Sequence, residues 1–263
     1  MKQAAFDNVG SMIRWTEAPG IEPARVYLHG LGSMSAVYHA HIASHPGLAG
    51  RRSLFVDLPG HGISDRPEHF GYTLDEHAEA VAVALDQAEV TGAELVAHSM
   101  GGAVAIVLAH RRPDLVARLV LAEANLDAFP PPTAASSGIA AHGEDEFVQE
   151  QYARVLAAVG PLWAATMRLA DPRALHRSAV GLRRGSDPVM RTMLGGLAIE
   201  RVYLQGEHSG DLPGREDLEA AGVRVVTVPG AGHNVMFDNP DAFVAAVAGL
   251  GRPGSVVASR RSG

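Results

Sequence analysis

Short apolar runs that alternate with helical patterns constrain the fold of this chain more than any other feature of its sequence. Each run is typical of a buried strand and is followed by a stretch with helical periodicity, an order that predicts a mostly parallel sheet with helices on its faces. The pattern predicts an α/β fold. Strands are expected at 25–28, 53–56, 93–97, 119–121, 201–204 and 223–228, with an antiparallel hairpin over residues 6–17 at one edge.

The strand pattern stops between residues 127 and 197. This block contains helical stretches over 144–159, 161–170, 172–182 and 188–194, and some of them begin with proline, which suits a first helical turn. We therefore expect an inserted helical cap over 127–197 and an α/β core domain formed by 1–126 and 198–250. The tail over 251–263 contains mainly Gly, Ser and Arg and is expected to be disordered.

Composition excludes several classes of protein. The net charge of −7 argues against a nucleic-acid binder, which would show a basic stripe, and the absence of cysteine excludes disulfides and a cysteine nucleophile. The first residues lack the apolar segment of a signal peptide, and no apolar run is long enough to span a membrane. We expect a cytoplasmic protein with a small-molecule substrate and no nucleic-acid or membrane partner.

The 13 histidines require that metal binding be considered. The densest group is His39, His41 and His45, whose neighbours are typical of an ordinary helix and its end. Zinc sites need three or four converging ligands with a recognisable spacing, and no His-Glu-x-x-His pattern occurs. We expect no metal and no cofactor.

Ser99 is the candidate nucleophile. It lies in Ala97-His98-Ser99-Met100-Gly101-Gly102, between an expected strand and an expected helix. Such a turn strains the serine backbone and points the hydroxyl out of the sheet, while the start of the helix offers N–H groups that stabilise an oxyanion. Ala97 replaces the first glycine of the G-x-S-x-G pattern, so the motif alone fits a chance serine at a glycine-rich helix start equally well.

Two further segments support this interpretation. His29-Gly30-Leu31-Gly32 follows a strand, and we assign the oxyanion hole to the backbone amides of Leu31 and Met100. His233 follows the last strand in Gly232-His233 and is the candidate general base. Separately, a glycine turn and a surface histidine would explain them. Together with Ser99 they follow the carboxyl ends of strands, where open α/β sheets place their sites.

These segments, with Asp57-Leu58-Pro59-Gly60-His61-Gly62-Ile63-Ser64-Asp65, resemble the α/β-hydrolase superfamily from about Arg25 to Leu250. The resemblance implies a mostly parallel eight-stranded sheet flanked by helices, with a helical cap and a Ser–His–acid triad. The segment from Asp57 to Asp65 is expected to be structural. The motifs indicate the fold and the mechanism but not the substrate, because this fold hosts many reactions.

The acid of the triad departs from the family pattern. In the superfamily it usually follows the seventh strand as Gly-x-x-Asp, whereas this chain has Gly206-Glu207-His208-Ser209. Some members, including a group of haloalkane dehalogenases, take the acid from the end of the sixth strand, where Glu123 lies. A glutamate there costs desolvation unless it is paired. We therefore expect Glu123, with Asp211 as the main alternative and Glu207 and Asp127 as lesser ones.

A serine nucleophile favours acyl chemistry, so we expect a carboxylic-ester hydrolase for small to medium apolar substrates. The alternatives are a C–C bond hydrolase, a thioesterase or a lyase with the same triad, and a ligand receptor without catalysis. Arg183-Arg184 is either solvated or a contact for an anionic substrate. The apolar side chains of the expected cap either pack on the core or line the site: Phe147, Val148, Tyr152, Leu156, Leu162, Trp163, Met167 and Leu169.

Overall fold

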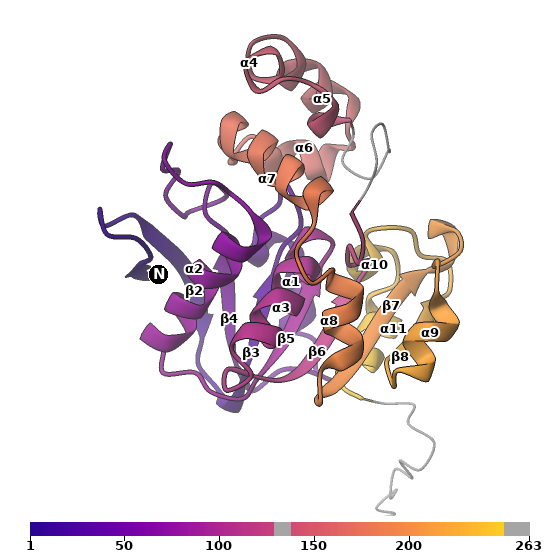
Figure 1. The fold of residues 1–263 in the computed structure, drawn as a ribbon. Helices are drawn as coiled ribbons and strands as arrows, with labels where there is room; N and C mark the ends of the chain where they lie inside the picture. The colour runs from indigo at the N-terminus through magenta and orange to yellow at the C-terminus, as the bar shows by residue number, and fades with distance from the viewer. Residues whose placement is uncertain (129–137, 250–263) are drawn as a thin grey trace, which may run out of the picture.

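The computed structural model describes residues 1–128 and 138–249, and its centre is one eight-stranded sheet (Figure 1). The strand order is β1-β2-β4-β3-β5-β6-β7-β8. β2 pairs antiparallel with β1 and with β4, and all other pairs are parallel. This confirms the expected fold class. The strands are β1 (Lys2–Ala5), β2 (Met12–Ala18), β3 (Ile21–Leu28), β4 (Arg51–Asp57), β5 (Ala93–His98), β6 (Val116–Ala122), β7 (Glu200–Gly206) and β8 (Arg224–Val228).

The expected hairpin over 6–17 exists, but its first strand lies earlier in the chain, at Lys2–Ala5. The turn begins at Asp7, whose carboxylate accepts hydrogen bonds from the backbone N–H groups of Val9 (3.1 Å) and Ser11 (2.8 Å). Gly10 completes it at φ +86°, a conformation that favours glycine. The side chain of Asp7 therefore fixes where the hairpin turns.

Helices cover both faces of the sheet, because alternate side chains of each strand point to opposite faces. Val26 and Leu28 join the apolar core beneath α2 (Leu74–Gln87), α3 (Met100–Arg111) and α8 (Met190–Gly196). Tyr27 joins the core on the other face, beneath α1 (Ser35–Ala43), α10 (Val235–Asp238) and α11 (Pro240–Val247). A short helix, α9 (Arg215–Ala220), joins β7 to β8.

A helical layer lies above the carboxyl ends of the parallel strands (Figure 1). Trp163 ties it to the loop after β3, since its Nε1 donates to the carbonyl oxygen of Leu31 over 2.8 Å. α8 falls within the range expected for the cap, yet it lies beside α3 (Figure 1). The layer consists of η2 (Ile139–Ala141), α4 (Glu144–Glu146), η3 (Phe147–Gln151), α5 (Tyr152–Ala158), α6 (Pro161–Met167) and α7 (Pro172–Arg184).

The division into a core domain and a cap over 127–197 stays a prediction. The tail expected over 251–263 lies outside the described residues. Within the described ranges, no helix combines the length and the apolar character that crossing a membrane requires.

Candidate active site

Ser99 occupies a strained turn between β5 and α3. Its φ is +52° and its ψ −121°, a combination that a residue with a side chain rarely adopts. The turn is held by the backbone, since Ser99 N–H donates to the carbonyl oxygen of Ala122 (2.9 Å) and Gly102 N–H donates to that of Ser99 (2.9 Å). A Cβ on Gly102 would lie 2.4 Å from Ala124 Cβ, so only glycine permits this approach of helix to strand.

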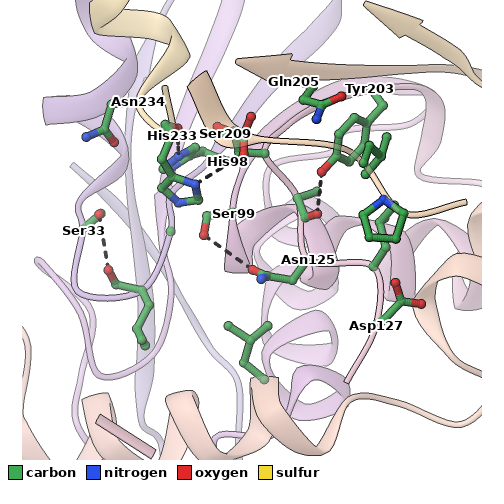
Figure 2. A pocket seen from close by; sticks show the side chains of 18 of the residues that line it. Ser33, His98, Ser99, Asn125, Asp127, Tyr203, Gln205, Ser209, His233 and Asn234 are labelled. Atoms are coloured by element: carbon green, nitrogen blue, oxygen red, sulfur yellow. Dashed lines mark hydrogen bonds and ion pairs between the residues drawn. The ribbon is translucent and has the colours of Figure 1, made fainter. Parts of the chain in front are cut away.

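His233 follows β8 and lines the same cavity as Ser99 (Figure 2). Its backbone is anchored from below by His98, whose Nε2 donates to the carbonyl oxygen of His233 over 2.9 Å. Burial lowers the pKa of His98 well below its ordinary value and thus keeps that ring neutral. The side chain of His233 is 52% exposed, and its ring lies beside that of His98, with the two ring centroids 4.8 Å apart.

Glu123 lies directly behind His233. Its backbone turns at φ +51° at the end of β6, and its side chain is only 11% exposed. One carboxylate oxygen, Oε1, accepts from the N–H of Gly206 over 2.6 Å, and the other, Oε2, lies 3.6 Å from Nδ1 of His233. The structure therefore brings the carboxylate of Glu123 to His233 and orients it through the N–H of Gly206.

The other acids considered from the sequence have different surroundings. Glu207 accepts from the N–H of Gly230 over 2.8 Å, and Asp127 pairs with Arg191 over 2.6 Å. Asp211 is exposed and lines the cavity, and none of the described residues makes an ion pair or hydrogen bond with its carboxylate. Of the four acids, Glu123 is the one that the structure places against His233.

Asn125 was missed by the sequence reasoning. The hydroxyl of Ser99 donates to Oδ1 of Asn125 over 3.5 Å (Figure 2), and Asn125 N–H approaches the carbonyl oxygen of Ser99 at 3.4 Å. The residue is 7% exposed and lines the cavity. Its place two residues after Glu123, on the loop that follows β6, is the signal that could have found it.

The two amides expected to form an oxyanion hole belong to Met100, which follows Ser99 in the chain, and to Leu31, which lines the same cavity. Met100 is the first residue of α3, so helix geometry leaves its N–H without an intrahelical acceptor. Leu31 belongs to the loop after β3, which lines the cavity together with Gly30. A Cβ on Gly30 would lie 3.1 Å from Ser99 Cβ, so a glycine there keeps this loop close to the nucleophile.

The cavity has a volume of about 680 Å³. Its apolar wall combines the loops of the sheet with the helical layer: Leu31, Ala124, Leu126, Trp163, Leu182, Leu212 and Pro213. Of the apolar side chains expected in the cap, Trp163 lines the cavity, whereas Phe147 and Met167 are fully buried in the core. Arg183 donates to the carbonyl oxygen of Ala140 over 2.6 Å, and neither it nor Arg184 lines the cavity.

The histidines considered as metal ligands bind elsewhere. His39 bonds to the carbonyl oxygen of Ser35 (3.2 Å), His41 bonds to that of Met236 (3.0 Å), and His45 accepts from Gly47 N–H (3.1 Å). In the part of the chain that the structure describes, no group of three or more His, Asp or Glu side chains is arranged to hold a metal ion.

Comparison with known proteins identifies the fold family. The family model for the alpha/beta hydrolase fold matches residues 24–192. An esterase of Mycobacterium tuberculosis is 32% identical over 238 residues, which cover 88% of this chain and 73% of that protein. A 2-(acetamidomethylene)succinate hydrolase of Mesorhizobium japonicum is 28% identical over 266 residues, with 91% and 92% covered.

Among solved structures, an esterase from Exiguobacterium antarcticum matches with a TM-score of 0.76 at 21% identity, over 95% of this chain and 98% of that one. At this identity the match speaks for the fold alone. The family model and the mycobacterial relative carry the assignment further, because each covers well over half of the chain. The chain therefore belongs to the α/β-hydrolase fold family, and it is an enzyme of the hydrolase type.

Proposed function

We propose that this enzyme hydrolyses carboxylic esters through an acyl-enzyme on Ser99. The observation that carries the proposal is the convergence of three side chains on one cavity: Ser99 on its strained turn, His233, and Glu123 with Oε2 3.6 Å from His233 Nδ1. These are the three roles of a Ser–His–acid triad, in the order that serine hydrolases of this fold use. The similarity to an esterase is consistent with the reaction.

Acylation begins when Ser99 Oγ attacks the carbonyl carbon of the ester and His233 Nε2 takes the hydroxyl proton. The carboxylate of Glu123 holds the Nδ1 proton of His233 and stabilises the imidazolium that forms. The amides of Leu31 and Met100 donate to the oxyanion of the tetrahedral intermediate. When the bond to the alcohol oxygen breaks, His233 gives its proton to that oxygen, and the acyl group stays on Ser99.

Deacylation repeats these steps with water. His233 takes a proton from water while the oxygen attacks the acyl carbon, and the second tetrahedral intermediate collapses to the carboxylic acid and free Ser99. In the structure the serine hydroxyl is bonded to Asn125, so it must leave Oδ1 and turn to His233 before it can react. In enzymes without bound substrate, catalytic hydrogen bonds are often long or poorly aligned and tighten when substrate binds.

The cavity volume of about 680 Å³ and its mostly apolar wall fit a small to medium acyl or alcohol group. Turnover of p-nitrophenyl butyrate tests the proposal, and Ser99→Ala is expected to lower kcat by a factor of about 10⁴ or more with the fold retained. Ser44→Ala is the matched control, because Ser44 caps α1 outside the cavity and bonds only to local backbone.

Unchanged turnover in Ser99→Ala would overturn the proposal. If the parent enzyme does not hydrolyse the ester but cleaves a thioester or a vinylogous diketone, ester hydrolysis is wrong and the same triad serves a different bond.

A further inference from the structure

The charged side chains that line the cavity are mostly acidic. Three carboxylates face it, those of Glu123, Asp127 and Asp211, against one permanent cation, Arg191, among the described residues. Residues 129–137, which continue the chain after Asp127, contain no charged side chain in the sequence. The balance of fixed charge in the cavity is therefore negative.

Arg191 is paired with an acid of the same cavity. Its Nε and Nη2 donate to the carboxylate of Asp127 over 3.0 and 2.6 Å, so the two charges neutralise each other. Its remaining nitrogen, Nη1, is buried from solvent and has no hydrogen-bond partner in the described structure. The carboxylate of Asp127 therefore compensates the charge of Arg191, and the pair together adds no net positive charge to the cavity.

Asp211 differs from the other two acids. Glu123 is directed to His233 and Asp127 to Arg191, whereas Asp211 is exposed, and no described residue neutralises it. It also borders a second hollow, lined by further acids that include Glu207, Glu216 and Asp217. Arg215, the cation of that hollow, is bonded to Glu219 over 3.0 Å. Acidic side chains therefore outnumber basic ones at this end of the cavity, and the carboxylate of Asp211 is not paired with any described residue.

We propose that the cavity selects esters that carry a cationic group and discriminates against anionic ones, with Asp211 as the residue that sets this preference. The inference rests on the proposed ester hydrolysis and specifies its substrate class. A charge in a cleft with low-dielectric walls focuses the field on the ligand. For a ligand charge about 6–8 Å away, partly screened by water, it changes kcat/KM by about three- to tenfold for each sign.

Three butyrate esters with tetrahedral groups of similar size test this selection: those of choline (cationic), 3,3-dimethylbutanol (neutral) and 2-hydroxyethanesulfonate (anionic). Release of butyric acid is followed in a pH-stat at pH 8, where histidine is ordinarily uncharged. The expected order of kcat/KM is choline, then the neutral ester, then the sulfonate, with about tenfold or more between the first and the last. Added salt is expected to reduce the differences in kcat/KM among the three esters, because it screens the charge of the cavity.

Asp211→Asn is expected to reduce the ratio of kcat/KM for the choline and sulfonate esters at least threefold. Asp241→Asn is the matched control: Asp241 is 91% exposed on α11, does not line the cavity, and its loss changes the net charge by the same amount. In that variant the ratio is expected to stay at the parental value.

Equal kcat/KM for the three esters, or a preference for the sulfonate, would overturn the inference. A parental ratio in Asp211→Asn would exclude Asp211 as its source. Failure of the proposed function gives a different result, namely no hydrolysis of the neutral ester that depends on Ser99.

Discussion

The loops at the carboxyl edge of the sheet form two halves with different burial. The first residues after β3 to β6 are buried: His29 and His61 are fully covered, and Ser99 and Asn125 are 8% and 7% exposed. Those that follow β7 and β8 lie open, with His208 and Asp211 exposed and His233 half-exposed. The proposed nucleophile Ser99 and the proposed acid Glu123 thus lie on the buried half, whereas the proposed base His233 and the proposed charge selector Asp211 lie on the open half.

This difference explains where the acid lies. Glu123 is held by a backbone turn at φ +51° and by the N–H of Gly206, so its carboxylate has one orientation. Asp211, on the loop after β7, has no partner among the described residues that would fix it. A residue that orients a histidine needs a buried, hydrogen-bonded position such as that of Glu123. A residue that meets varied substrates in solvent needs an exposed position such as that of Asp211.

The largest expected effect concerns the two acids. Glu123→Gln is expected to lower kcat on p-nitrophenyl butyrate by about 10³–10⁴, because a neutral amide no longer fixes the tautomer of His233 or stabilises its imidazolium. Asp211→Asn is expected to lower kcat less than tenfold on the same ester. Steady-state kinetics of both variants decides which residue is the acid of the triad. A larger loss of kcat in Asp211→Asn than in Glu123→Gln would assign that role to Asp211, on the loop after β7.

The second prediction concerns the packing of the buried half around Gly102. Gly102→Ala would place a Cβ 2.4 Å from Ala124 Cβ and thereby displace the segment that carries Glu123 and Asn125. We expect a loss of about 1–3 kcal/mol in the free energy of unfolding and a loss of about 10²-fold in kcat/KM. Gly196→Ala, which meets no atom within 4 Å, is the control. Parental activity in Gly102→Ala would show that the segment tolerates displacement.

The smallest effect concerns acid stability. Burial lowers the pKa of His77 to about 3 and that of His61 to about 4, both from an ordinary 6.5, so only the unfolded chain binds these protons between about pH 6.5 and 4. Stability conferred by the neutral rings is therefore complete above pH 6.5 and is lost as the pH falls. Burial raises the pKa of Asp57 from 3.8 to about 6, so the folded state binds a proton at this carboxyl as the pH falls below 6. This one group therefore opposes the loss of stability caused by the two histidines.

Denaturant titrations at stepped pH between 7.5 and 4.5 measure this loss. His77→Gln is expected to make the fall shallower by up to about 1.4 kcal/mol per pH unit, because one buried ring no longer differs between the two states. Equal slopes in the parent protein and in His77→Gln would contradict the assignment of acid sensitivity to this buried ring.

Much of the fold could be predicted from apolar runs, since the central strands are buried on both faces and read as continuous apolar sequence. The strand expected at 25–28 begins earlier, at Ile21, because its first residues are exposed and include Glu22 and Pro23, which interrupt the apolar run. The first strand of the hairpin was placed too late for a similar reason: the position of the turn depends on hydrogen bonds to the side chain of Asp7.

The parts of the candidate site that could be predicted are those where the chemical type of a single residue indicates its surroundings. Glu123 could be expected beside a partner because an isolated carboxylate at the end of a buried strand is costly. The bond from Ser99 to Asn125 and the pairing of Arg191 with Asp127 could not, since each joins segments whose approach depends on the packed fold. The assigned roles of Ser99, His233 and Glu123 stay predictions.

Labelling with a fluorophosphonate, followed by peptide mapping, tests the central claim most directly. The reagent forms a covalent phosphonyl adduct with a serine that a neighbouring base activates. The account predicts one adduct per chain, on the peptide that contains Ser99, with labelling strongly reduced in Glu123→Gln. An adduct on another residue, or no adduct in an enzyme that hydrolyses esters, would contradict it.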